Sequence, residues 1–120
     1  MMAFLNPLTF TDRSAWRAWL IENHSISNEI WLIIRRAGCQ DPGLRLGEAV
    51  EEALCFGWID SQLKPVDMKS FSLRFTPRRH KSIWAQTNIE RVRKLIKEGK
   101  MTPDGLAVIP ENIRNHLEES

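Results

Sequence analysis

The stretch 75–88, FTPRRHKSIWAQTN, concentrates side chains that bind anions. Five consecutive residues in it have cationic, potentially cationic or hydroxyl side chains: Arg78, Arg79, His80, Lys81 and Ser82. Such groups form an oxyanion site when the fold brings them together, because guanidinium groups donate paired hydrogen bonds to carboxylate and phosphate. Free amides at the start of a following helix add donors. The alternative is a solvated basic bend that binds nothing in particular, since charge runs usually mark exposed faces.

A second candidate is the GWID segment, residues 57–60. Asp60 follows a glycine expected to end a helix, and it faces away from Ile59. If the next two strands pair as a simple hairpin, Asp60 and Arg74 share its polar face and can form an ion pair. Asp60 would then be a general base or a ligand-orienting carboxylate. Alternatively, it is a structural partner that fixes an arginine, as most such carboxylates are.

Three further residues complete the predicted ligand-binding set: Trp84 and Asn88 within the 75–88 stretch, and Arg91 shortly after it. Trp58 and Trp84 could stack on a base or a sugar, although most buried tryptophans only pack. The three histidines are too scattered to predict a metal site. The sequence contains no glycine-rich phosphate loop, nucleophile elbow or HExxH motif. We therefore predict no metal, no cofactor and no assigned catalytic residue.

Positive charge is unevenly distributed along the chain. Residues 71–100 carry nine basic and two acidic side chains, a formal charge of +7, whereas the whole chain carries only +2. A segment of this charge favours an anionic small molecule or an acidic protein surface as its partner and repels cationic peptides. Nucleic acid is a further candidate partner, although no nucleic-acid-binding motif accompanies the charge.

Composition predicts a single globular domain over residues 1–120. Hydrophobic residues make up 42% and charged residues 27%, which are ordinary globular values. No apolar run approaches the ~20 residues of a membrane span, and the first residues lack the features of a secretory signal. The two cysteines, Cys39 and Cys55, lack metal-ligand spacing and are expected to be free thiols. We therefore expect a cytoplasmic protein.

Hydrophobic periodicity predicts an α+β fold with a small antiparallel or mixed sheet, in which a central strand and a hairpin pack with three to five helices. The strand at 30–34 is apolar on both faces, so we expect it in the sheet interior. Residues 65–69 are expected to form the hairpin turn. The predicted order is a helix from about 12, the strand at 30–34, a helix at 46–56, a hairpin at 58–76, a helix at 87–98 and a short helical turn at 102–106 before the tail.

The last long helix has clear sequence signals at both ends. Thr87 and Glu90 have capping-box spacing, and Gly99 is placed to end the helix. Its inner face is expected to carry Ile89, Val92 and Ile96.

These same segments resemble the YdeI/OmpD-associated (bacteriocin-protection) family of bacterial proteins. The resemblance covers nearly residues 9–107 and is most specific in GWID, in PRRHKSIWAQTN (77–88) and in GKMTPDG (99–105). It implies a small α+β domain associated with protection against bacteriocins and cationic peptides, without an established reaction. Ala85 stands where relatives often have serine. The sequence also stops before the lysine-rich helical C-terminal segment of many relatives.

The function predicted from sequence is non-catalytic binding of an anion or an acidic partner, linked to stress or bacteriocin protection. Because the +7 segment repels cationic peptides, we expect any such protection to be indirect. One alternative is a small enzyme in which Asp60 acts as base, assisted by His80 or Ser82, while arginines hold an oxyanion. The second alternative is nucleic-acid binding.

Overall fold

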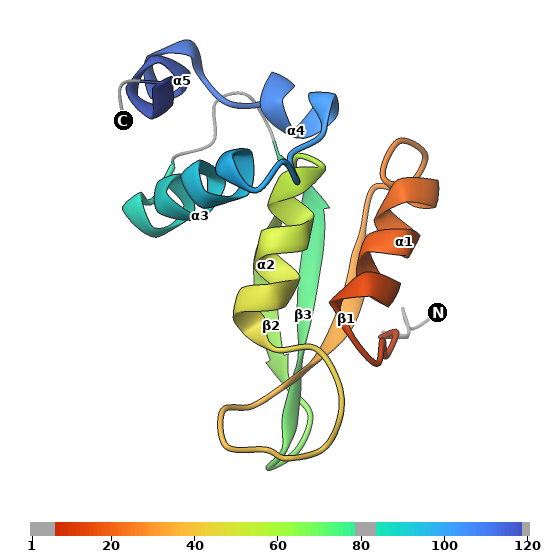
Figure 1. Cartoon of the computed structure of the whole chain (residues 1–120). Helices are drawn as coiled ribbons and strands as arrows, with labels where there is room; N and C mark the ends of the chain where they lie inside the picture. The colour runs from red at the N-terminus through yellow and green to blue at the C-terminus, as the bar shows by residue number, and fades with distance from the viewer. Residues whose placement is uncertain (1–6, 79–83, 119–120) are drawn as a thin grey trace.

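The computed structural model describes residues 7–78 and 84–118, except for the side chains of residues 116 and 118. Within these residues, three strands and five helices form a small α+β fold, which confirms the predicted class (Figure 1). The elements are α1 (Arg13–Asn23), β1 (Ile30–Arg35), α2 (Leu46–Cys55), β2 (Trp58–Pro65), β3 (Ser70–Pro77), α3 (Gln86–Lys97), α4 (Pro103–Ala107) and α5 (Glu111–Glu118).

The sheet is antiparallel and has the order β1-β3-β2. The second hairpin strand, β3, is therefore central, and β1 is not the interior strand that its apolar pattern predicted. Beyond β1, the described chain adds only a single bridge from Leu8 to Leu32. The outer face of β1 is nevertheless covered locally, because Trp31 is buried and lies under the ammonium group of Lys64, 5.4 Å from the ring centroid.

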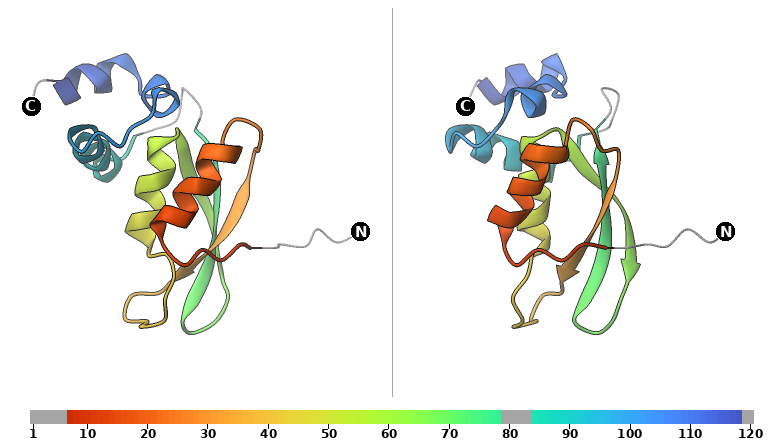
Figure 2. Two further views of the ribbon diagram at one scale, coloured as in Figure 1. Left: turned by 45° about the vertical axis from the view of Figure 1, so that its right-hand side comes forward. Right: turned by 90° about the vertical axis from the view of Figure 1, so that its right-hand side faces the viewer.

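Helices α1 and α2 cover one face of the sheet (Figure 2). Trp16 is fully buried between them and the sheet, 5.4 Å from the ring of Phe75 between centroids. Its indole nitrogen donates a hydrogen bond to the Ala49 carbonyl at 3.0 Å, so this large side chain leaves no polar atom unsatisfied. Leu32 and Leu73 face the same helices from β1 and β3. This layer is the hydrophobic core that fixes the sheet.

Helices α3, α4 and α5 gather at one end of this layer, around the C-terminus of α2 (Figure 1). The Cys55 carbonyl anchors α4, because it accepts hydrogen bonds from Thr102 Oγ1 at 2.6 Å and from the Thr102 amide at 3.0 Å. A Cβ atom on Gly105 would lie 2.2 Å from that carbonyl oxygen. Glycine at this position is therefore required by the close approach of α4 to α2.

The predicted helix ends are partly confirmed. Gly57 and Gly99 follow α2 and α3 with φ angles of +79° and +71°, the left-handed conformation that ends helices. Thr87, in contrast, lies inside α3, and the N-cap is Ala85, which has no side chain to bond the first amides. The inner face of α3 also differs from the prediction, since Val92 is buried but Ile96 is 41% exposed.

Several cations of the 71–100 segment pair with carboxylates. Arg74 binds Glu29, and Lys94 binds Glu51 at 3.2 Å. The excess positive charge seen in the sequence is therefore partly neutralised by residues distant along the chain. None of the described helices has both the length and the apolar character needed to cross a membrane.

Candidate functional site

A β-bulge separates the two hairpin residues that the sequence places together. Asp60 is opposite Phe75, but the register shifts at Ser61, so that Gln62 is opposite Arg74. Directly opposed residues in an antiparallel pair point to the same side. Asp60 therefore faces the helix-covered side with Phe75, and Arg74 faces the other side. The expected pairing of Asp60 with Arg74 was wrong, because the extra residue reverses the alternation.

Arg74 instead pairs with a residue that precedes β1. Its Nε donates to Glu29 Oε1, and its Nη1 donates to Ser61 Oγ at 3.3 Å. The hydrogen bond from Arg74 lowers the pKa of the Glu29 carboxyl, so the pair stays charged at neutral pH. Both side chains remain partly exposed. Such a surface pair is worth only about 0–1 kcal/mol, which leaves Arg74 able to exchange Glu29 for another anion.

Arg78 is buried, with 7% of its surface exposed, directly after β3. Its backbone amide donates to the Gly57 carbonyl at 2.7 Å, which fixes its position. Its guanidinium carbon lies 4.0 Å from the centroid of the Trp84 ring, a cation–π contact. Burial lowers the pKa of Arg78, and the negative charge of Asp60 opposes this change. Arg78 is thus a positioned and largely dehydrated cation.

Arg74 and Arg78 line one hollow of about 430 Å³, together with Asn28, Thr76 and Pro77. We call these five residues the arginine hollow. Two guanidinium groups, an amide and a hydroxyl supply donors that suit a carboxylate or a phosphate group. The sequence prediction contained both arginines but missed Asn28 and Thr76. Thr76 was recognisable from the sequence as a strand residue two positions from Arg74. Asn28 joins the arginine hollow only because β1 pairs with β3, which the sequence does not reveal.

A second hollow, of about 230 Å³, lies on the helix-covered side. Its lining residues are Leu46, Val50, Asp60, Ala85, Thr87, Asn88 and Arg91. Arg91 Nη1 donates to Asn88 Oδ1 at 3.1 Å, which orients both side chains. The predicted residues Asp60, Asn88 and Arg91 therefore do come together, but around a different hollow from that of Arg74.

Four predicted site residues, Arg79, His80, Lys81 and Ser82, lie outside the described residues. Their convergence on a shared anion therefore stays a prediction. The same holds for the contact between Asp60 and His80 or Ser82 that the enzymatic alternative requires.

Of the two alternatives for Trp58, packing is confirmed and stacking on a ligand is excluded, because Trp58 is 1% exposed and packs edge-on against Trp19. Its strand begins inside the core, and no base or sugar can reach its ring. Trp84 is partly buried and already stacks on Arg78. Within the described part of the chain, no three histidine, cysteine or carboxylate side chains are grouped as metal ligands.

Comparison with known protein families gives a match to a family whose function is unknown. The model titled Domain of unknown function (DUF8412) matches residues 8–108. The chain belongs to this family. The DUF8412 match spans the sheet, helices α1 to α4 and the residues of both hollows. No curated protein and no solved structure gives a significant match. The resemblance to the YdeI/OmpD-associated family stays a prediction.

Proposed function

We propose that this DUF8412 domain binds an oxyanion-bearing ligand in the arginine hollow without transforming it. The ligand is a carboxylate or phosphate carried by a small molecule or by an acidic protein surface. The observation that carries the proposal is the placement of Arg78, which is buried, stacked on Trp84 and in one hollow with Arg74. A dehydrated guanidinium gains more from an anion than a solvated one does, because the local dielectric constant is lower.

The acidic neighbours of the two arginines set the expected strength of binding. Glu29 competes directly for Arg74, and Asp60 compensates part of the charge of Arg78. An incoming anion must displace Glu29 or bind beside it, so we expect moderate affinity and specificity for ligands that engage both arginines. This also argues for reversible binding rather than for a permanently occupied site.

The broader biological setting follows the family resemblance. A bacterial cytoplasmic protein that protects against bacteriocins or cationic peptides would act indirectly, through its anionic ligand or acidic partner. Cys39 and Cys55 are both free thiols, as predicted, which suits a reducing compartment.

Isothermal titration with citrate and with inorganic pyrophosphate tests the proposal. Citrate represents carboxylate ligands, and pyrophosphate represents phosphate ligands. We expect at least one of them to bind, and Arg74→Gln to weaken that binding about tenfold, the effect of losing a charge-assisted hydrogen bond. Affinity should also fall as salt is raised from 50 to 300 mM.

Arg36→Gln is the matched control, because it removes the same charge near the opposite end of the sheet. Arg36 lies over the Phe71 ring, beyond the strand end that carries Arg35. If both variants weakened anion binding equally, the change in net charge alone would explain the effect, and the proposal would be contradicted. Failure of both probes to bind would contradict it as well.

A further inference from the structure

An apolar cavity lies between α3, α4 and α5, and it shares no lining residue with either hollow described above. It has a volume of about 460 Å³. We call it the helix pocket, and its lining residues are Arg93, Ile96, Lys97, Leu106, Ile109, Arg114 and Leu117. This volume falls within the range of about 300–1,000 Å³ that is typical of small-molecule sites.

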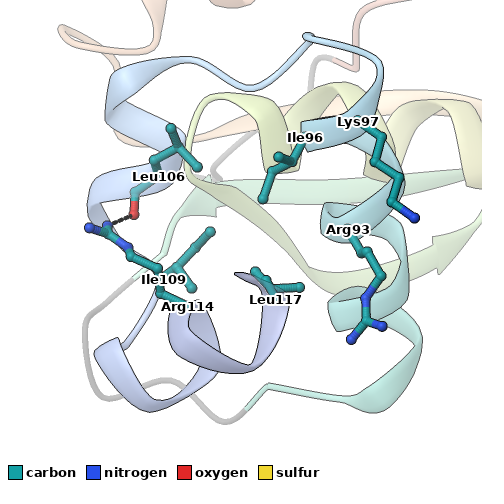
Figure 3. Close-up of a pocket in the computed structure, with 7 residues that line it drawn as sticks. All are labelled: Arg93, Ile96, Lys97, Leu106, Ile109, Arg114 and Leu117. Atoms are coloured by element: carbon teal, nitrogen blue, oxygen red, sulfur yellow. Dashed lines mark hydrogen bonds between the residues drawn. The ribbon is translucent and has the colours of Figure 1, made fainter. Parts of the chain in front are cut away.

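The helix pocket combines an apolar floor with cationic edges (Figure 3). Ile96, Leu106, Ile109 and Leu117 surround its middle, whereas Arg93 and Lys97 lie on the α3 side and Arg114 lies on the opposite side. The charged ends of Arg93 and Lys97 point away from the apolar side chains, at the rim. None of the described lining residues is acidic. Arg114 is held in place by a hydrogen bond from its guanidinium to the Leu106 carbonyl.

The two α3 cations differ from their neighbours on the same helix. Lys94 pairs with Glu51, and Arg91 is bonded to Asn88. Arg93 and Lys97 have no carboxylate within ion-pair distance among the described side chains. Both also line an adjoining hollow, together with Glu90, Lys94 and Glu98. The Nε atom of Arg93 is also buried, with no hydrogen-bond partner in the described part of the chain. Buried donors of this kind are normally satisfied, so this atom points to a missing acceptor.

We infer that the helix pocket binds an amphiphilic carboxylate with a single medium-length acyl chain. The carboxylate lies at Arg93 and Lys97, which are one helical turn apart on one face of α3. The acyl chain covers Ile96 and passes between Leu106, Ile109 and Leu117 toward Arg114. This site is independent of the arginine hollow, so either can fail without the other.

Calorimetric titration with hexanoate, octanoate and decanoate, each below its micellar concentration, tests the acyl-chain part. Each added methylene should tighten binding about fourfold if it enters the apolar floor. Decyltrimethylammonium has a similar chain and the opposite charge, so it should bind at least tenfold more weakly than decanoate. Affinity that does not change with chain length, or equal binding of the cationic amphiphile, would overturn the inference.

Charge-removing variants test the headgroup part. The double variant Arg93→Gln/Lys97→Gln should weaken decanoate binding about tenfold, and Lys94→Gln should leave it within twofold of the unmodified protein. Lys94 is the matched control, because it lies on the same helix but outside the helix pocket. Equal effects of the two changes would contradict the assigned headgroup position.

Methyl NMR locates the bound chain even if a variant folds poorly. Decanoate added to the unmodified protein should shift the methyl signals of Ile96 and Ile109 and leave that of Ile34, a fully buried core residue of β1, in place. Shifts spread over the whole protein would indicate non-specific adsorption and overturn the inference. So would binding that is seen only with phosphatidylglycerol vesicles and never with the free carboxylate, since the membrane surface would then be the ligand.

Discussion

The guanidinium carbon of Arg78 lies 4.0 Å from the centroid of the Trp84 ring, in a contact that joins the end of β3 to the chain entering α3. Stacking covers the face of a guanidinium, so its hydrogen bonds form along its edge. The contact therefore fixes Arg78 in the arginine hollow and also ties the end of β3 to the segment before α3. Both roles depend on the aromatic face of Trp84.

Replacing Trp84 separates the aromatic contribution from simple packing. We expect Trp84→Leu to lower the free energy of unfolding by about 1 kcal/mol through loss of the cation–π contact, and to weaken anion binding at the arginine hollow several-fold. Trp84→Phe keeps an aromatic face and should lie between Trp84→Leu and the unmodified protein in both properties. Urea unfolding and anion titration measure the two effects. If Trp84→Phe changed stability and anion binding as much as Trp84→Leu, the aromatic face would have no role.

Ala85 is an N-cap residue without a capping side chain, and this gives a stabilising prediction. Its backbone is extended, with φ −70° and ψ 147°, as capping requires. We expect Ala85→Ser to raise the free energy of unfolding by about 0.5–2 kcal/mol, because the hydroxyl can bond an amide of the first turn of α3. Urea unfolding measures the change. Thr87→Ala should have little effect, since Thr87 lies within the helix and not at its cap.

Two glycines in helices should respond oppositely to the same substitution. Gly105→Ala forces a Cβ against the Cys55 carbonyl, so we expect a loss of about 1–3 kcal/mol in the free energy of unfolding. Gly47→Ala, in the first turn of α2, meets nothing within 4 Å and should stabilise the protein by about 0.5–1 kcal/mol. Thermal unfolding distinguishes the two. Similar melting temperatures for both variants would contradict the close packing of α4 on α2.

The arginine–glutamate cluster between α1 and α2 gives the fold a pH dependence. Arg13 binds Glu51 at 2.8 Å and the buried Glu52 at 2.6 Å. Although burial opposes it, hydrogen bonds from Arg13 and Lys94 lower the pKa of Glu51. A lowered folded-state pKa stabilises the protein above the unfolded value, about 4.3, and this stabilisation is lost as the pH falls through the folded value.

Arg13→Gln should therefore cost about 2 kcal/mol in the free energy of unfolding at pH 7, as expected for lost charge-assisted hydrogen bonds. The difference from the unmodified protein should begin to shrink below the unfolded-state pKa of about 4.3 and continue to shrink as the pH falls through the lowered folded-state pKa of Glu51. Urea unfolding from pH 3 to pH 7 measures it. Arg36→Gln is the control for the pH dependence, because the described contacts of the Arg36 side chain are with the Phe71 ring and a backbone carbonyl rather than with a carboxylate. A difference that stays constant over this range would show that the Glu51 contact does not contribute.

The fold class, most elements and the helix-ending glycines could be predicted from the sequence, because periodicity and terminal signals are local. The sheet order could not be, since the apolar faces of β1 do not reveal that β3 lies between β1 and β2. The bulge at Ser61 has no clear sequence signal either. That single inserted residue moved Asp60 to the helix-covered side and left Arg74 to pair with Glu29.

The candidate site was predicted in part for the same reason. Arg78 and Arg74 were recognisable by residue type, and they do share a hollow. The helix pocket was not foreseen, because Ile96 follows the apolar period of α3 and appeared to belong to the inner face. Its floor forms only when α4 and α5 fold back over α3, an arrangement that the local sequence does not encode.

The most direct test of the central claim is the effect of Glu29→Gln on the affinity for citrate or pyrophosphate. Because Glu29 competes for Arg74, its neutralisation should tighten binding about two- to fivefold, corresponding to a surface ion pair of up to about 1 kcal/mol. Glu22→Gln removes the same charge from the exposed side of α1 and serves as the control. The account predicts that Glu29→Gln raises the affinity for the anion more than Glu22→Gln does. This difference should disappear when Arg74→Gln is added to both variants. Equal affinities for the two variants, or weaker binding by Glu29→Gln, would contradict it.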